Sequence, residues 1–144
     1  MPLTRKRKIE LLRGVTLFAD LSERALATVA AKTVDIAYAP GQYIVRQGQV
    51  GTGVYLIVDG HARVVRGHQT LARLGPGDFF GELSILDQQP RVAHVVAEEP
   101  TTCLALASWD FAKVLERHPK IALALLRGMA QRLRTATATP SVHQ

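Results

Sequence analysis

A long central stretch in which apolar and polar residues alternate limits the fold more than any other feature of this sequence. It runs from about Val34 to Leu106, and glycine or proline interrupts it every few residues. Valine, isoleucine, leucine and tyrosine at a period of two are typical of strands, and the glycines and prolines mark turns between them. The segments that we expect to be strands read YIVRQG, GVYLIVDG, HARVVRG, QTLARLGPGDF, RVAHVVAEEP and TTCLALA. Strands at this spacing predict a sandwich or a roll, and the lack of βαβ alternation disfavours a doubly wound sheet.

The tightest turn predicted in this stretch is VDGHARV, with Asp59 and Gly60 at its centre. An Asp-Gly pair between alternating apolar residues is a strong local signal for a two-residue β-hairpin. We therefore expect a tight hairpin here.

Helical periodicity precedes the strands. From Lys8 to about Lys32, apolar residues recur at intervals of three and four, which predicts two short helices separated by GVTLFADL. Asp20 or Ser22 is placed to cap the second helix, and Asp20 with Glu23 three residues later resembles a capping box.

Helical periodicity also follows the strands. Ser108 is predicted to cap a helix containing WDFAKVLERH, and Pro119 suits the first position of a second helix, PKIALALLRGMAQRLR. Two apolar stripes run along that second helix: Leu123, Leu126, Ala130 and Leu133 form one, and Ile121, Leu125 and Met129 form the other. One stripe can pack on the roll and the other could pair with a second chain, so a homodimer and simple packing against the N-terminal helices both stay open.

The net charge of +6 is concentrated at the N-terminus, because the run from Arg5 to Lys8 supplies four of the six charges. A basic arm can contact phosphate backbones or acidic surfaces without specificity. We expect instead a solvated, mobile terminus.

Neither a membrane span nor a secretory signal is predicted. The longest run without polar residues in the C-terminal half is Ile121 to Leu126, far short of the ~20 residues that cross a bilayer. Cys103 is the only cysteine, which excludes an intramolecular disulfide and a zinc site made of cysteine pairs, and we expect it to be buried. A cytoplasmic protein is the expectation.

The segment FGELSILDQQPRV combines an acid, an apolar run, a turn and one arginine. A cyclic phosphodiester of a nucleoside presents a single negative charge, a ribose hydroxyl and an apolar-faced base. Arg91 could neutralise the phosphate with a fork of charged donors, and Glu82 is an acceptor suited to the ribose hydroxyl. Backbone N–H groups around Leu83 and Ser84, at the start of a short helix, would add donors, and Gly81 permits close approach.

The longer segment FFGELSILDQQPRVAHVVA resembles the phosphate-binding cassette of the cyclic nucleotide-binding domain family, of the catabolite activator and cyclic-AMP-dependent kinase regulatory subunit type. The family pattern is roughly FGE-L-(A/S)-L, a short variable turn, then R-(A/S/T)-A, and the eight residues between Glu82 and Arg91 match its spacing. LLRGVTLFADLSERALATVA, APGQYIVRQGQVGTGVYLIVDGHARV and the closing helix pair extend the resemblance over most of the chain. It implies an α+β fold, an antiparallel, jelly-roll-like β-roll (double-stranded β-helix) flanked by N-terminal helices and a C-terminal helix pair.

The resemblance also implies a binding site for cyclic AMP or, as the second possibility, cyclic GMP. The residues that it assigns to the ligand are Gly81, Glu82, Leu83, Ser84, Arg91 and Val92. Glu82 would bind the ribose 2′-hydroxyl and Arg91 the exocyclic phosphate oxygens, with the backbones of the other four around the sugar-phosphate. Members that favour cyclic GMP usually have threonine or serine at the position of Val92, and the hydroxyl of that residue can reach the guanine amino group. The side chain of Val92 has no hydroxyl and cannot form this hydrogen bond. His94 departs from the family's common threonine and is expected to be structural, facing away from Val95.

The 144 residues are expected to form a single domain. Its predicted parts are a basic arm at 1–8, a helical lead-in at 9–33, a β-roll at 34–107 with the cassette at 80–93, C-terminal helices at 108–134 and a tail at 135–144.

The predicted function is that of a sensor or regulatory domain, in which ligand binding moves the C-terminal helices about a hinge near Ala107 to Trp109. Closure is expected to bury apolar area on Leu125, Met129 or Leu133.

An enzyme is not predicted, and no metal or cofactor is expected. The five histidines lack the close spacing of a metal-dependent β-barrel enzyme, so the sequence favours that class least. A ligand-free interaction domain of the same fold stays open, as does a fragment or relative of a transcription regulator. Because only about ten residues follow Arg134, we expect no helix-turn-helix reader in this chain and no specific DNA binding.

Overall fold

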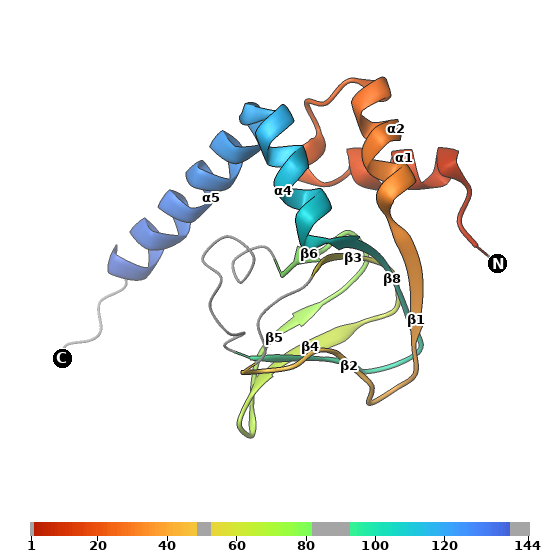
Figure 1. The fold of residues 1–144 in the computed structure, drawn as a ribbon. Helices are drawn as coiled ribbons and strands as arrows, with labels where there is room; N and C mark the ends of the chain where they lie inside the picture. The colour runs from red at the N-terminus through yellow and green to blue at the C-terminus, as the bar shows by residue number, and fades with distance from the viewer. Residues whose placement is uncertain (1, 49–52, 82–92, 139–144) are drawn as a thin grey trace.

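The computed structural model describes residues 2–48, 53–81 and 93–138. Along the chain, helices precede and follow a run of strands (Figure 1). The N-terminal helices are α1 (Arg5–Arg13), the short 3₁₀ helix η1 (Thr16–Phe18) and α2 (Glu23–Lys32). The strands are β1 (Val34–Tyr38), β2 (Tyr43–Val45), β3 (Gly53–Asp59), β4 (Ala62–Arg66), β5 (Gln69–Leu74), β6 (Phe79–Phe80), β7 (His94–Ala97) and β8 (Thr101–Ala107). The C-terminal helices are α4 (Ser108–Arg117) and α5 (Pro119–Ala138).

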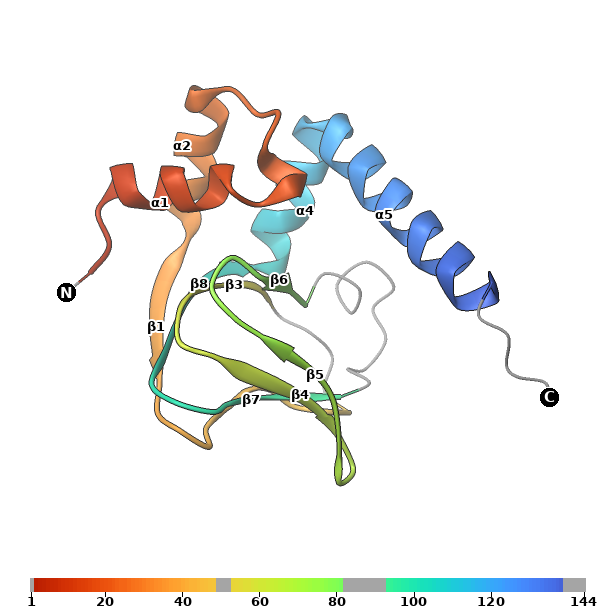
Figure 2. The ribbon, with the colours of Figure 1, turned by 180° about the vertical axis from the view of Figure 1, so that it is seen from behind.

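The strands form two four-stranded antiparallel sheets, ordered β1-β8-β3-β6 and β2-β7-β4-β5. Strands from opposite ends of the stretch are neighbours, as β1 with β8 and β2 with β7, so the chain is rolled up rather than folded as a meander. α1, α2 and α4 lie over one end of this roll, and α5 runs outward from that end (Figures 1 and 2). The predicted β-roll with flanking helices is confirmed.

The hairpin predicted at Asp59 and Gly60 is wrong. β3 pairs with β8 in one sheet, whereas β4 pairs with β7 in the other, so the chain passes between sheets at Gly60. Gly60 has a φ of 91°, and a Cβ atom there would lie 2.5 Å from the Pro100 carbonyl oxygen. The glycine is needed for a crowded corner and not for a hairpin. The tight turn lies instead between β4 and β5, where Arg66 pairs with Gln69.

The alternation along β3 and β8 separates two apolar clusters. Val54 and Leu56 of β3 face the helices, in a cluster that includes Phe18, Leu26, Leu104, Leu106, Phe111, Ile121 and Leu125. Ile57 faces the inside of the roll, in a cluster that includes Tyr38, Ile44, Val45, Ala62, Val95, Ala97 and Cys103. The sheet that contains β3 is therefore covered by helices on one face and by the second sheet on the other.

The basic run at the N-terminus is helical, so the boundary predicted between an arm at 1–8 and helices from residue 9 is wrong. α1 begins at Arg5, and the Thr4 hydroxyl accepts a hydrogen bond of 3.1 Å from the Arg7 N–H. Lys8 Nζ lies 3.3 Å from an Asp35 carboxylate oxygen and donates to the Thr33 carbonyl oxygen at 3.1 Å. These contacts with the start of β1 fix α1 against the roll.

Local signals at the other helix ends give mixed outcomes. Ser22 caps α2 by accepting from the Ala25 N–H at 3.1 Å, so the Asp20–Glu23 capping box is not formed. Pro119 is the first residue of α5, as predicted, whereas Ser108 is the first residue of α4 and Ala107 is its N-cap. α5 continues to Ala138, four residues into the predicted tail, and the Thr137 hydroxyl donates to the Leu133 carbonyl oxygen at 3.0 Å.

The two stripes of α5 differ in burial. Ile121 and Leu125 are 1% and 4% exposed and belong to the cluster beneath the helices, whereas Leu126 and Leu133 are 62% and 65% exposed. Packing against η1 and α4 therefore uses the Ile121 stripe, and the other stripe faces outward. No helix among the described residues combines the length and apolar character needed to span a membrane.

Candidate functional site

Gly81 is the one predicted ligand-binding residue within the described part of the chain. Glu82, Leu83, Ser84, Arg91 and Val92 lie outside the described residues. Gly81 follows β6 directly and has a φ of 101°, a backbone conformation that strains residues with a side chain. On the far side of the cassette, Ala93 is buried and leads into β7.

The described ends of the cassette belong to different sheets. β6 is the edge strand of the first sheet, where Phe80 pairs with Tyr55 of β3. β7 is a central strand of the second sheet, between β2 and β4. Residues 81–93 therefore connect an edge of one sheet to the middle of the other.

The apolar interior of the roll changes in burial toward β6. Ile57, Ala62 and Cys103 are fully buried, whereas Tyr55, Val64, Leu74 and Phe80 pack against the same cluster and are only partly buried. The rings of Tyr55 and Phe80 stack with centroids 5.4 Å apart and an interplanar angle of 23°. Aromatic and aliphatic surfaces of this kind suit an apolar-faced base.

These interior residues were not predicted from the sequence to be part of a site. Their signal was present, because alternation along β3 and β4 places Tyr55 and Val64 on the same side as Ile57 and Ala62. Knowing which apolar positions border the ligand would have required the strand pairing.

Burial disfavours the charged forms of two side chains inside the roll, Cys103 and Tyr38. Burial raises the pKa of the Cys103 thiol to about 12. Burial, with further contributions from Tyr55 and Cys103, also raises the pKa of the Tyr38 hydroxyl. The predicted burial of Cys103 is confirmed, and its thiol is an apolar part of the wall.

His94 lies on the opposite face of β7 from the interior. Its Nδ1 accepts a hydrogen bond of 2.9 Å from the Gln47 N–H, and its ring meets the Tyr43 ring edge-on, with centroids 4.8 Å apart. Val95, next along the strand, belongs to the interior cluster. The predicted orientation of His94, facing away from Val95, is confirmed.

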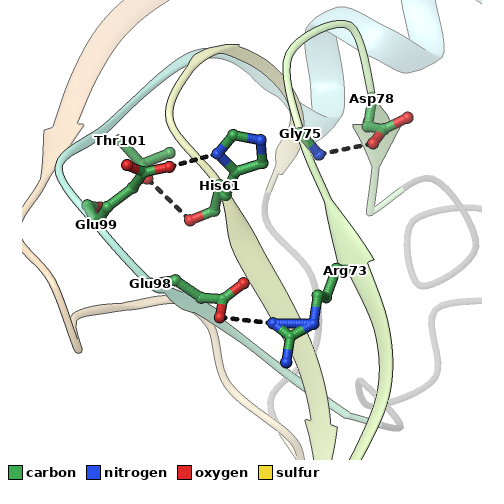
Figure 3. A network of polar contacts seen from close by, with 7 residues as sticks. All are labelled: His61, Arg73, Gly75, Asp78, Glu98, Glu99 and Thr101. Carbon is green, nitrogen blue, oxygen red and sulfur yellow. Dashed lines mark hydrogen bonds and ion pairs between the residues drawn. The ribbon is translucent and has the colours of Figure 1, made fainter.

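Polar contacts close the corner where the chain crosses between the sheets (Figure 3). His61 contacts the Glu99 carboxylate, and Arg73 donates to a Glu98 oxygen at 2.9 Å. Thr101 is almost fully buried, and its hydroxyl is placed to donate to the Glu99 carbonyl oxygen at 2.8 Å or to the His61 carbonyl oxygen at 3.1 Å. These partners stabilise the corner beside Gly60, and among the described residues no cluster of histidine, cysteine and acidic side chains could hold a metal ion.

Comparisons with known proteins agree with this architecture. The sequence model of the cyclic nucleotide-binding domain matches residues 35–118, which include the whole cassette. The cyclic AMP receptor protein of Thermus thermophilus is 37% identical over 130 residues, which make up 87% of this chain and 60% of the relative. The chain thus spans about three fifths of the length of that curated relative.

Solved structures share the fold. The crystal structure of the Thermus thermophilus catabolite activator protein superposes with a TM-score of 0.76 at 37% identity, covering 84% of this chain and 59% of that one. The N-terminal domain of a transcriptional regulator from Streptomyces coelicolor gives 0.72 at 32% identity, covering 93% and 96%. A cyclic-AMP-bound mutant of the regulatory subunit of a cyclic-AMP-independent protein kinase A from Trypanosoma brucei gives 0.78 at 26% identity, covering 86% and 46%.

The family match covers more than half of the chain, and the roll, the helices at its end and the position of the cassette between the two sheets agree with it. The chain belongs to the cyclic nucleotide-binding domain family.

Proposed function

We propose that this chain is a sensor domain that binds cyclic AMP through the cassette at residues 80–93. One observation carries the proposal: the family match extends across a segment that retains both charged anchors, Glu82 and Arg91, at the family spacing. The partly buried apolar residues around Tyr55 and Phe80 support it, because they provide a surface for the base beside the start of that segment.

The roles follow from the chemistry of the ligand. The Arg91 guanidinium would neutralise the phosphate, and the Glu82 carboxylate would accept a hydrogen bond from the ribose 2′-hydroxyl. Backbone groups of Gly81, Leu83 and Ser84 would line the sugar-phosphate on one side. The positive φ of Gly81 supports this role, because a residue without a Cβ atom lets the backbone turn close to a ligand.

Cyclic AMP is proposed over cyclic GMP because Val92 offers no hydroxyl to the guanine amino group. The names of the relatives support the same choice, since one is a cyclic AMP receptor protein and another was crystallised with cyclic AMP. Valine at this position contributes an apolar contact and no specific hydrogen bond.

Ligand binding is proposed to act through α4 and α5. α4 begins directly after β8, so a change in the roll reaches the helix without an intervening loop. Leu125 is already buried beneath the helices, so closure gains nothing there, and Leu133 or Met129 is the place where apolar area can still be covered. The ligand favours closure only to the extent that it binds the closed arrangement more tightly.

The chain is also proposed to work as a module of a regulator. Its relatives are named as a receptor protein, a transcriptional regulator and a kinase regulatory subunit, and it covers almost all of a structure named as an N-terminal domain. The outward stripe on α5, with Leu123, Leu126 and Leu133, supports a homodimer through that helix.

Side-by-side calorimetric titration of the purified chain with cyclic AMP, cyclic GMP and open-chain 5′-AMP tests the proposal. We expect saturable binding of cyclic AMP, weaker binding of cyclic GMP and little binding of 5′-AMP, whose extra charge and open phosphate do not fit the same pocket. The variant Val92→Thr should bring the two cyclic nucleotides closer in affinity. If neither cyclic AMP nor cyclic GMP binds, the chain would be assigned to the ligand-free interaction domains.

A further inference from the structure

The groove between α1 and α2 is a second candidate site, and it is independent of the proposed nucleotide function. The two helices pack against each other and cross in the helical layer (Figures 1 and 2), and an open groove of about 760 Å³ lies along their outer surface. Ile9 of α1 and Ala27 of α2 contribute its apolar lining. Their other faces belong to or border the core, so the floor of the groove is held rigidly.

The rim of the groove is predominantly basic. Arg5, Lys6, Arg13 and Arg24 line it, and all four side chains are exposed. Arg13 lies 3.9 Å from Glu23, whereas Arg5, Lys6 and Arg24 form no ion pair within the described residues. Three exposed cations thus border the groove without a carboxylate partner among those residues.

The orientation of α1 explains why these charges point outward. Lys8 is turned inward and satisfied by Asp35 and by the Thr33 carbonyl oxygen. Because residues on a helix are spaced by 100°, anchoring Lys8 against β1 leaves Lys6 on the opposite side, whereas Arg5, one turn before Lys8, is exposed as the first residue of the helix. The basic run is therefore a fixed array rather than a loose arm.

The lining distinguishes between anionic partners. Glu10 and Glu23 also line the groove, and their carboxylates would repel the evenly spaced phosphates of a nucleic acid. The apolar floor likewise offers nothing to a phosphate backbone. A helix with apolar residues on one face and a few acidic residues beside them fits both features, since its apolar side chains meet the floor and its separate carboxylates can face Arg5, Lys6 and Arg24 without lying beside Glu10 or Glu23.

We propose that the α1–α2 groove binds an acidic amphipathic helix of a partner protein. The apolar floor contributes contact area, and Arg5, Lys6 and Arg24 select for negative charge on the partner. Glu10 and Glu23 discriminate against a uniform polyanion.

Fluorescence anisotropy of the full chain with a labelled helical peptide of leucine and glutamate, with leucine at the a and d positions of each heptad, tests this proposal. We expect saturable binding that is lost when the glutamates are replaced by glutamine, and lost again for polyglutamate, which has no apolar face. Tighter binding of duplex DNA or of anionic phospholipid vesicles than of the peptide would overturn the proposal in favour of a nucleic acid or a membrane.

Charge reversal at the rim distinguishes binding in the groove from nonspecific attraction to the net positive charge of the chain. Arg5→Glu with Arg24→Glu should weaken peptide binding about tenfold or more. Both positions lie in the first turns of their helices, where an acidic residue is favourable, so we expect the fold to persist. Arg66→Glu with Lys113→Glu changes the net charge equally at exposed positions away from the groove and should have little effect. An equal loss in both double variants would refute a specific groove, and thermal unfolding would verify that each variant is folded.

Discussion

Gly60 joins the two sheets with a backbone that has a φ of 91° and no room for a side chain. A Cβ atom would lie 2.5 Å from both the Pro100 carbonyl oxygen and the Thr101 hydroxyl. The Thr101 hydroxyl is itself within hydrogen-bond distance of the Glu99 and His61 carbonyl oxygens, so a shift of Thr101 would disturb these contacts. A single glycine thus lets the roll close.

Gly60→Ala should therefore lower the free energy of unfolding by more than about 2 kcal/mol, from left-handed strain and from the contact with Pro100. Gly67→Ala is the matched control, because Gly67 also has a positive φ, of 62°, but nothing lies within 4 Å of its Cβ position. That variant should lose only about 1 kcal/mol. Urea unfolding of both variants measures the difference, and equal losses would contradict the crowding at the corner.

Cys103 should be inert toward thiol reagents in the folded chain. Burial raises its pKa to about 12, so at pH 8 the thiolate is a very small fraction. Because the unfolded thiol ionises at a lower pH, this group also favours the folded state less as the pH rises above about 9 and toward 12. Rapid labelling by a disulfide reagent at pH 8 without denaturant would show that the interior is open, whereas labelling in urea should be fast.

At the scale of the elements, the sequence was sufficient to predict those features of helices and strands that depend on neighbouring residues. The order of helices and strands followed from periodicity, and Ser22 and Pro119 begin their helices as their chemistry favours. Contacts between distant residues could not be predicted. The pairing of β3 with β8 was hidden behind an Asp-Gly signal, and the contacts that fix α1 against the roll join Lys8 to Thr33 and Asp35, which are distant in sequence.

For the candidate site too, the sequence predicted the features that depend on neighbouring residues but not those that depend on strand pairing. The cassette was recognisable because Glu82 and Arg91 lie close in sequence with a specific spacing. Their convergence in space stays a prediction, since residues 82–92 lie outside the described part of the chain. Tyr55 and Phe80 come together through strand pairing, which the sequence alone did not reveal.

The junction of β8 and α4 provides an intrinsic probe of helix movement. Trp109, the only tryptophan, lies in the first turn of α4 and is 65% exposed. If ligand binding moves α4 and α5, cyclic AMP should change the emission wavelength or intensity of Trp109, whereas 5′-AMP should not. Unchanged emission at a saturating concentration verified by calorimetry would contradict movement at this junction.

At the scale of the whole molecule, helices cover one sheet, and α5 extends beyond them (Figure 2). The apolar stripe of α5 with Leu126 and Leu133 is exposed. A stripe of this kind on a regulator module is expected to meet a second copy. Sedimentation equilibrium should detect a dimer that weakens in Leu126→Lys, because a charge would enter the apolar seam. Leu71→Lys, at an exposed leucine of β5, is the control. A monomeric wild-type chain at all concentrations would remove α5 as a self-association surface.

The proposed binding of cyclic AMP depends most on Arg91 neutralising the phosphate of a ligand held inside the roll. Calorimetric titration of cyclic AMP into Arg91→Ala tests this directly, with Arg24→Ala on the exposed face of α2 as the control for net charge. We predict a loss of about 1.5–3 kcal/mol for Arg91→Ala, or about ten- to a hundredfold in affinity, and no change for Arg24→Ala. Equal cyclic AMP affinity in Arg91→Ala and the wild-type chain would contradict it.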